Sequence, residues 1–224
     1  MTVDEGYYEV ATPGSLSERL MIEARDRIYA DFLAACTPRA SDTILDIGVS
    51  DVLNDGANML ERLYPHPNQI TACGLGEAKE FQSAFPAVRY RQIAPRTPLP
   101  FPEKSFDIAT SNAVLEHVGG VGIQREFIAE IARVAWRVFI SVPHRFFPIE
   151  HHTAIPFAHW TDTTFRVACA LTRKWKWARE DQLRLMSWWR LASVVPEGVS
   201  YRIGYTGLRL GPLSSNLYLV IKTS

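Results

Sequence analysis

Between residues 43 and 142, short apolar segments alternate with amphipathic ones, and this pattern limits the folds that the chain can adopt. Five segments have the length and apolar content of buried strands, namely residues 43–48, 69–73, 88–93, 105–110 and 138–142. The stretches between them have helical character, such as the apolar spacing of residues 124–134. Strands that alternate with helices at this spacing predict a doubly wound, mainly parallel sheet.

The flanking segments predict a helix before this sheet and a strand pair after it. Ser15 and Glu18 form a capping-box pattern that opens a helix, and Pro38 ends it because the residue before a proline avoids helical geometry. Late strands near residues 200–205 and 216–222 could close the sheet as a hairpin-like pair, antiparallel to the rest. We therefore predict an α/β, Rossmann-like fold: a mostly parallel seven-stranded sheet with helices on both faces.

Charge and cysteine usage exclude several classes of protein. The 24 Lys and Arg residues balance 24 Asp and Glu residues, which gives no support for a strongly basic nucleic-acid binder. The three cysteines are far apart and lack CxxC spacing, so reduced thiols are the simpler interpretation. No uncharged apolar run approaches the roughly 20 residues of a membrane span. We expect a cytoplasmic protein with no membrane span.

The turn after the first strand lies where such folds bind ligands, beyond the carboxyl ends of the strands. Asp46 ends this strand, and Gly48 permits a tight turn with close backbone approach. A GxGxxG fingerprint is absent, because Ser50 stands at the second glycine position. Taken alone, the segment is equally well explained as a strand closed by a glycine turn.

The segment Leu99–Val118 reads LPFPEKSFDIATSNAVLEHV. It closely resembles the LPFPDxSFDxVxSxxVLEHV block of class I S-adenosylmethionine (SAM) methyltransferases of the type 11-like group. With the turn at Asp46, the resemblance covers approximately residues 40–145 and implies SAM as the cofactor. It also implies that Ser111 and Asn112 lie beside the methionine part of SAM, and that Asp46 helps to hold the same end.

Two polar anchors of the family are missing. Gly74, followed by Leu75, stands where an acidic residue usually holds the ribose hydroxyls, although Glu77 could substitute. Ala94 stands where an acidic residue often lies near the adenine amino group. The predicted cofactor-binding residues are Asp46, Gly48, Ser50, Gly74, Leu75, Ala94, Ser111 and Asn112. Either this chain binds SAM differently, or it is a catalytically degenerate binding or scaffold protein.

The stretch Pro143–Trp160 reads PHRFFPIEHHTAIPFAHW. It resembles a PNRxFPxExHT…PxxHW segment found in a bacterial subset of the family, which implies a place over the cofactor pocket. Glu150, His151 and His152 are the predicted catalytic residues, because a histidine can take a proton from an acceptor hydroxyl near neutral pH. The alternative is a loop whose side chains only satisfy backbone groups.

Two further patterns have alternative interpretations. Glu116 and His117 could pack and cap a helix, or join a loop histidine at a metal; the ExxEH pattern of two metal-dependent branches lacks its first glutamate here, so no metal is predicted. The cationic and aromatic run Arg173–Arg179 suits nucleic acid or a lipid interface, but a solvated helix edge with packed tryptophans is the simpler interpretation.

The resemblance implies a SAM-dependent methyltransferase acting on an oxygen or nitrogen of a small-molecule or saccharide acceptor. A nicotinamide oxidoreductase is disfavoured because GxGxxG is absent. We expect one domain over residues 1–224, no nucleic-acid partner, and a chain that could form a homodimer. Its parts are a helical cap (1–40), a cofactor-binding core (41–142), an acceptor-site loop with helices (143–199) and a terminal strand pair (200–224).

Overall fold

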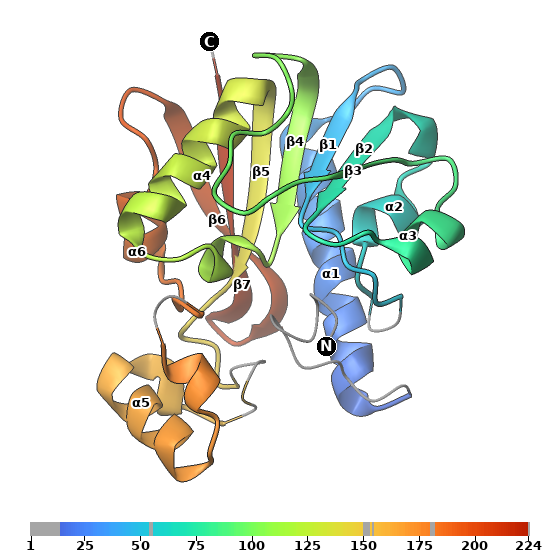
Figure 1. Cartoon of the computed structure of the whole chain (residues 1–224). Coiled ribbons are helices and arrows are strands. Elements are labelled where there is room, and N and C mark those ends of the chain that lie inside the picture. The colour runs from blue at the N-terminus through green and yellow to red at the C-terminus, as the bar shows by residue number, and fades with distance from the viewer. Residues whose placement is uncertain (1–13, 54–55, 150–152, 154, 180–181, 224) are drawn as a thin grey trace.

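The computed structural model describes residues 14–53, 56–149, 153, 155–179 and 182–223. One seven-stranded sheet has the order β3-β2-β1-β4-β5-β7-β6 (Figure 1). Its strands are β1 (Ile44–Ile47), β2 (Ile70–Gly74), β3 (Arg89–Gln92), β4 (Phe106–Asn112), β5 (Ala135–Pro143), β6 (Ser200–Leu210) and β7 (Leu213–Lys222). The predicted Rossmann-like α/β fold is confirmed.

The sheet is mixed, because β7 pairs antiparallel with both of its neighbours. The pairings among β1 to β5 are all parallel, as the alternation of strands and helices predicts. The late strands form the expected hairpin and are longer than their sequence pattern indicates. Since β6 and β7 are mutually antiparallel, β6 runs in the same direction as β5, and only β7 runs against the rest.

Helices cover both faces of the sheet, and each face has its own apolar core. Along β1, Ile44 joins the core under α1 (Leu16–Cys36), α2 (Met59–Leu63) and α3 (Lys79–Ala84), whereas Leu45 joins the core under α4 (Val121–Val134) and α6 (Trp188–Ser193). Successive strand residues point to opposite faces, and β1 is buried on both. This double burial is what a central parallel strand requires.

Helix α1 begins where the capping box predicts. The Ser15 hydroxyl accepts a hydrogen bond from the Glu18 amide at 3.1 Å, which satisfies one of the unpaired amides of the first turn. The helix ends at Thr37, which adopts a left-handed conformation with φ 44°. Only its second half is deeply buried, at Ile28, Phe32 and Cys36. The first half of α1 therefore lies free of the core.

The segment after β4 differs from the predicted helix. Leu115–His117 forms a short 3-10 helix, η3, and the α-helix starts only at Val121, after Gly119 with φ 124°. The glycine breaks the helix because it takes a backbone conformation that other residues rarely adopt. The LEHV part of the sequence block therefore belongs to a turn at the strand end.

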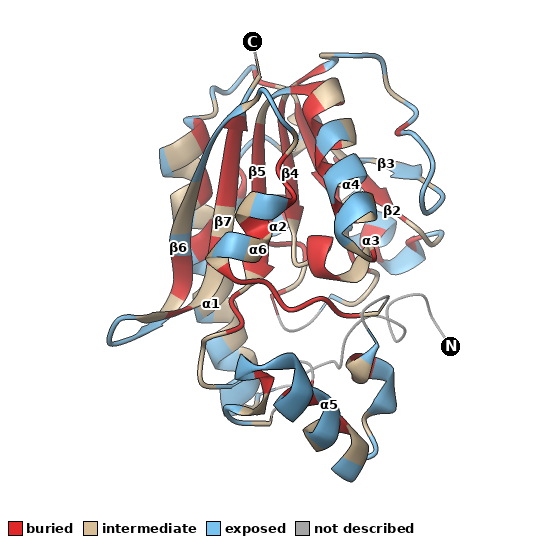
Figure 2. Cartoon of the chain, turned by 90° about the vertical axis from the view of Figure 1, so that its left-hand side faces the viewer, coloured by how far each residue is buried: buried red, intermediate tan, exposed pale blue. Residues whose placement is uncertain are grey.

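Residues 158–179 and 182–185 form a small lobe beyond the carboxyl ends of β4 and β5 (Figures 1 and 2). It contains η4 (Ala158–Trp160), α5 (Asp162–Leu171) and η5 (Trp175–Ala178). A separate apolar cluster holds it together, made of Phe165, Cys169, Trp177, Leu183 and Leu185. In the described part of the chain, no helix is long and apolar enough to cross a membrane.

Candidate functional site

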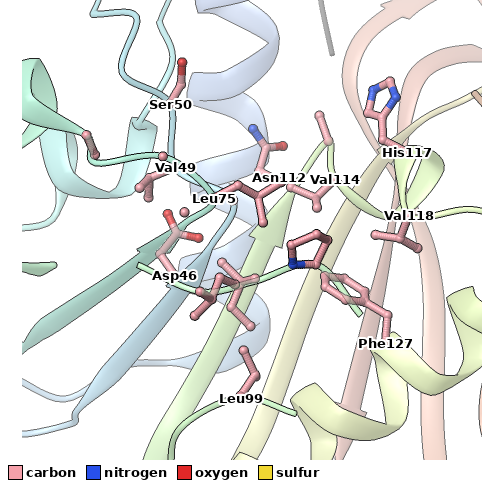
Figure 3. A pocket seen from close by; sticks show the side chains of 18 of the residues that line it. Asp46, Val49, Ser50, Leu75, Leu99, Asn112, Val114, His117, Val118 and Phe127 are labelled. Carbon is pink, nitrogen blue, oxygen red and sulfur yellow. The ribbon is translucent and has the colours of Figure 1, made fainter. Parts of the chain in front are cut away.

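A pocket of about 1050 Å³ opens at the carboxyl ends of the central strands (Figure 3). It lies where the strand order reverses between β1 and β4, the place where doubly wound sheets bind ligands. Seven of the eight predicted cofactor-binding residues line it: Asp46, Gly48, Ser50, Gly74, Leu75, Ala94 and Asn112. The eighth, Ser111, is fully buried, and its hydroxyl donates to the Ile47 carbonyl at 2.9 Å, which ties β4 to β1.

Gly48 is required at its position for two reasons. Its φ of 98° is a conformation that side chains disfavour, and a Cβ added there would lie 2.2 Å from Val114 Cγ2. The Gly48 and Val49 amides both donate to the Cys73 carbonyl, at 2.8 and 3.1 Å. The turn is thus clamped between β2 and the segment after β4, which gives the pocket a fixed floor.

Ser50 is held by an asparagine that the sequence interpretation did not single out. The Ser50 amide donates to Asn58 Oδ1, and Asn58 Nδ2 donates back to the Ser50 carbonyl, both at 2.8 Å. The neighbouring Asp51 accepts from the Phe81 amide at 2.9 Å, in the first turn of α3. Asn58 has φ 56°, a left-handed value that asparagine tolerates better than most residues. These contacts fix Ser50 and Asp51 at the start of the loop between β1 and α2.

The missing acid at Gly74 has a physical explanation in Tyr90. A Cβ at Gly74 would lie 2.8 Å from the Tyr90 hydroxyl and 3.3 Å from the Val49 carbonyl oxygen. That hydroxyl donates to the Gly76 carbonyl at 2.5 Å, across the β2–β3 pair. The space that an acidic side chain would need at position 74 is therefore occupied by a ring from β3.

Glu77 lies at the pocket edge, three residues further on. It forms an ion pair with Lys79 at 2.7 Å, and this cation holds the pKa of Glu77 below its usual range. Both side chains are exposed and line the pocket. Glu77 is therefore the acidic residue nearest in sequence to Gly74, and its carboxyl group is ionised at neutral pH.

The wall beyond β3 is apolar where the family often has an acid. Leu75, Ile93, Pro95, Leu99 and Phe127 all line the pocket. Ala94 offers no side-chain acceptor, and its carbonyl accepts from the Thr97 hydroxyl at 2.8 Å. Such a wall suits the faces of a flat aromatic ring better than its polar edge.

Asp46, at the buried end of the pocket, interacts with a second carboxyl group, Glu61, which lies behind it and does not line the pocket. Burial raises the pKa of Asp46 to about 7, against the lowering effects of the Glu61 side chain and the Ile47 amide. Burial and the neighbouring Asp46 raise the pKa of Glu61 well above its usual value. The two side chains interact, although neither Glu61 oxygen makes a hydrogen bond of ordinary geometry. This pair retains a proton that two solvated carboxyl groups would have lost.

On the β4 side, Asn112 and His117 face the pocket (Figure 3). The Asn112 side chain accepts from the Ser141 hydroxyl of β5, which fixes its orientation. His117 Nδ1 lies 2.7 Å from the carbonyl oxygen of Gln182, which also lines the pocket. His117 connects the core to the lobe, a role that its place in the sequence block does not indicate.

The described residues contain no group of three or more His, Cys, Asp or Glu side chains that could hold a metal ion. Glu116 and His117 approach each other at 3.9 Å, and His117 packs against Trp177 with ring centroids 6.1 Å apart. The three cysteines are buried and free. Burial raises the pKa of Cys73 to about 12, so its thiol stays protonated.

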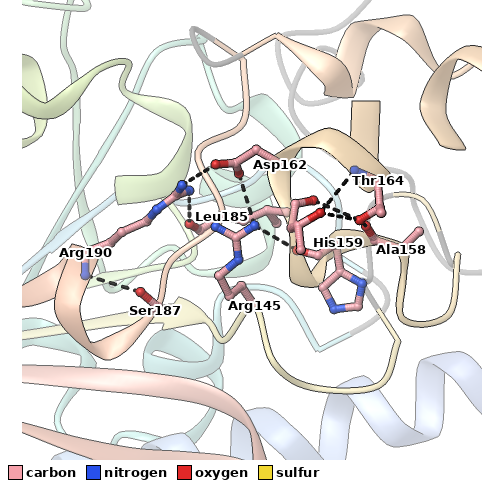
Figure 4. Close-up of polar contacts among 9 residues, drawn as sticks. Arg145, Ala158, His159, Asp162, Thr164, Leu185, Ser187 and Arg190 are labelled. Atoms are coloured by element: carbon pink, nitrogen blue, oxygen red, sulfur yellow. Dashed lines mark hydrogen bonds and ion pairs between the residues drawn. The ribbon is translucent and has the colours of Figure 1, made fainter. Parts of the chain in front are cut away.

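The predicted catalytic residues Glu150, His151 and His152 lie outside the described residues. The chain on either side of them is anchored by an arginine pair (Figure 4). The guanidinium group of Arg145 is buried and donates hydrogen bonds to the Asp162 carboxylate and to the His159 carbonyl oxygen, each at 3.0 Å. Arg190 binds the other oxygen of Asp162. Two guanidinium groups thus share one carboxylate at the base of the lobe.

Residues 58–136 match the family model of a methyltransferase domain. No protein of curated function matches the sequence.

Solved structures resemble most of the chain. A SAM-dependent methyltransferase of Thermotoga maritima, described as a possible histamine N-methyltransferase, has a TM-score of 0.57 at 13% identity, covering 92% of this chain and 91% of its own. One from Mesorhizobium loti has a TM-score of 0.57 at 14% identity, covering 88% and 98%. One from Aquifex aeolicus has a TM-score of 0.52 at 12% identity, covering 91% and 92%. At such identities these likenesses establish the fold.

Proposed function

We propose that this chain is a class I SAM-dependent methyltransferase that transfers a methyl group from SAM to an oxygen or nitrogen atom of a small-molecule or saccharide acceptor. The observation that carries the proposal is the pocket at the reversal of strand order, floored by the Gly48 turn. Its volume of about 1050 Å³ lies at the upper end of the range for ligand sites, roughly 300–1,000 Å³, so it has room for a cofactor and an acceptor together.

The residues that line the pocket fit the three chemical parts of SAM. Asp46 offers a carboxylate at the buried end for the amino group of the methionine part. Glu77 offers two acceptor oxygens to the ribose hydroxyls from the pocket edge. The apolar wall that includes Ile93 and Phe127 packs against the adenine ring. This fit favours a cofactor-binding protein over a degenerate scaffold.

SAM, when bound, supplies a methyl group activated by the positive sulfonium. The protein's task is to hold the acceptor atom in line with that methyl group, because correct positioning is the main source of rate in such a transfer. The acceptor atom forms the new bond to the methyl carbon as the sulfur–methyl bond breaks, so that the demethylated cofactor leaves as a neutral thioether and the acceptor loses a proton. We assign the removal of this proton to His151 or His152, with Glu150 as an orienting group.

The same proposal extends to the organisation of the chain. Residues 143–199 supply the acceptor side, and Gln182 from this segment lines the pocket. The cap (1–40), the core (41–142) and the terminal strand pair (200–224) complete one domain in the cytoplasm. Light scattering of the purified chain measures whether it forms a homodimer.

Calorimetric titration with SAM, followed by a labelled-methyl assay over a panel of hydroxyl and amine acceptors, tests this function. We expect SAM to bind and His151→Ala or His152→Ala to lower transfer by a factor of about 10²–10⁴ with SAM affinity retained. Wild-type turnover by both variants would remove the base assignment. A chain that gives neither heat nor a thermal shift with SAM or its demethylated product would overturn the enzyme assignment itself.

A further inference from the structure

Exposed large apolar side chains are concentrated in and before the lobe. They are Ile149, Phe157, Trp160, Val167, Leu171 and Trp175. Leu171 is 80% exposed and Trp175 is 61% exposed, far more than most side chains of their size. Val167 and Leu171 are four residues apart on α5 and therefore share one helical face. A gathering of this kind marks an interaction surface more often than chance exposure.

The packing of the lobe does not use this outer face. Its core is formed by the opposite face of α5, through Phe165 and Cys169, together with Trp177 of η5. Trp177 is buried, as the sequence interpretation expects, but Trp175 is not. Helix α5 is consequently apolar on two faces and packs only one of them within the described residues. A helix of that kind requires a second apolar contact.

Several cationic residues are close in sequence to the exposed apolar residues. Between residues 160 and 182 the sequence has five cations and three acids: Arg166, Arg173, Lys174, Lys176 and Arg179 against Asp162, Glu180 and Asp181. Arg166 directly precedes Val167, and Arg173 lies between Leu171 and Trp175. Both arginines are exposed, and no described residue forms an ion pair with either. The surface therefore combines aliphatic and indole groups with a positive charge.

The lobe is also connected to the pocket. The buried side of η5 contacts His117 through Trp177, and the Gln182 carbonyl reaches the same histidine. The lobe stands on the side of the sheet to which the parallel strands point, where the pocket opens (Figure 1). An assembly docked on the lobe would lie next to the pocket mouth.

We propose that this surface, formed by Val167, Leu171 and Trp175 with Arg166 and Arg173, docks the protein on the anionic surface of a phospholipid membrane. Aliphatic side chains insert among acyl chains, tryptophan lies at the headgroup level, and flanking arginines bind lipid phosphates. Nucleic acid is a poorer fit, because Val167 and Leu171 cannot stack on bases. A second copy of the same surface would bring like charges together.

Cosedimentation with lipid vesicles tests this, and it requires neither SAM nor an acceptor. We expect the full chain to bind vesicles of phosphatidylcholine with one-third phosphatidylglycerol, and to bind pure phosphatidylcholine at least tenfold more weakly. The Leu171→Glu/Trp175→Glu and Arg166→Glu/Arg173→Glu pairs should each reduce binding to anionic vesicles at least tenfold, since each basic residue near such a surface contributes about 1 kcal/mol, roughly fivefold in affinity.

Two matched variants control for chemistry and charge. Trp136→Glu changes an exposed tryptophan at the amino end of β5, and Arg89→Glu/Arg91→Glu reverses two exposed arginines of β3. Both should bind anionic vesicles within twofold of wild type. Equal loss in test and control variants, or no binding of wild type to anionic vesicles, would overturn the proposal. If the same lobe variants instead abolish binding to single-stranded oligonucleotides while vesicles are ignored, the surface serves nucleic acid and the lipid assignment is wrong.

The outcome is separable from the methyltransferase proposal. A chain that binds vesicles but not SAM retains the lipid surface and loses the enzymatic assignment, whereas the reverse result removes only the surface. Because the changed side chains are exposed and lie outside the pocket lining, SAM titration and thermal melting of each variant report whether the fold is intact.

Discussion

The floor of the pocket, at the Gly48 turn, is tightly packed, whereas the outer face of the lobe is exposed. At the floor, the Gly48 turn is fixed by two hydrogen bonds to β2 and by the close approach of Val114, so a single added methyl group has no space. In the lobe, Leu171 and Trp175 project outward and touch little of the chain. The floor therefore tolerates little change in side-chain volume, whereas packing within the described residues does not constrain the outer face of the lobe.

The largest effect should come from one methyl group added at the floor of the pocket. Gly48→Ala introduces a side chain at φ 98° and 2.2 Å from Val114. We expect it to lower the free energy of unfolding by about 3 kcal/mol and to weaken SAM binding at least a hundredfold, because strain and a clash coincide. Thermal melting and calorimetry measure both. Gly122→Ala, which adds a methyl group in open space on α4, should leave SAM affinity unchanged and raise the free energy of unfolding by at most about 1 kcal/mol.

Asp46 provides a second test of the floor, through protons. With a pKa of about 7, its carboxyl is largely protonated in the free protein below neutrality, whereas the cationic amino group of SAM favours the ionised form. Affinity should therefore rise about tenfold between pH 6 and pH 8, with release of a proton on binding. Asp46→Asn should weaken binding about 5- to 150-fold at pH 8 and remove the pH dependence. Calorimetry in buffers of different ionisation heat measures the proton; a steep pH profile in the variant would contradict the assignment.

Breaking the base of the lobe should affect stability and leave cofactor affinity alone. Asp162→Ala removes the shared carboxylate from Arg145, which is buried, and from Arg190. Because Asp162 is itself half exposed and screened by water, we expect a loss of about 1–2 kcal/mol. Thermal melting and proteolysis at the lobe report this loss. Change in SAM affinity beyond twofold would show that the two regions are coupled more tightly than their contacts indicate.

The smallest expected effect comes from placing an acidic residue at position 74, where the family usually has one that binds the ribose hydroxyls. Gly74→Asp should weaken SAM binding severalfold despite restoring the usual residue type, because the new side chain meets the Tyr90 hydroxyl. Gly74→Asp combined with Tyr90→Phe removes that oxygen and should recover wild-type affinity or better. If the single variant already binds SAM more tightly than wild type, Tyr90 does not exclude the acid.

The fold was predictable because its signals are local or periodic. The alternation over residues 43–142 and the block Leu99–Val118 predict the strands, and seven of the eight predicted cofactor residues line one pocket. The features of the site that the sequence did not predict depend on contacts between residues that no local sequence pattern brings together. Tyr90 and Gly74 meet only through the register of β2 against β3, and Asn58 reaches Ser50 only once the loop has closed.

The tryptophans show the limit of composition. Trp175 was expected to pack, since aromatic residues are most often buried, yet it is 61% exposed. Trp177, two residues beyond Trp175, is buried against the lobe core. Which tryptophan turns inward depends on where α5 ends, at Leu171, and on the left-handed residue Arg173 that follows it. That geometry is set by the packed lobe and cannot be obtained from residue types.

Helix α1 contributes part of the pocket wall from its less buried half. Met21 and Arg25 line the pocket from its first half, whereas Ile28, Phe32 and Cys36 anchor the second half under the sheet. Unwinding from the amino end would uncover the pocket at little energetic cost, since the anchoring residues stay packed. Amide hydrogens of residues 17–25 should therefore exchange with solvent well before those of residues 28–36.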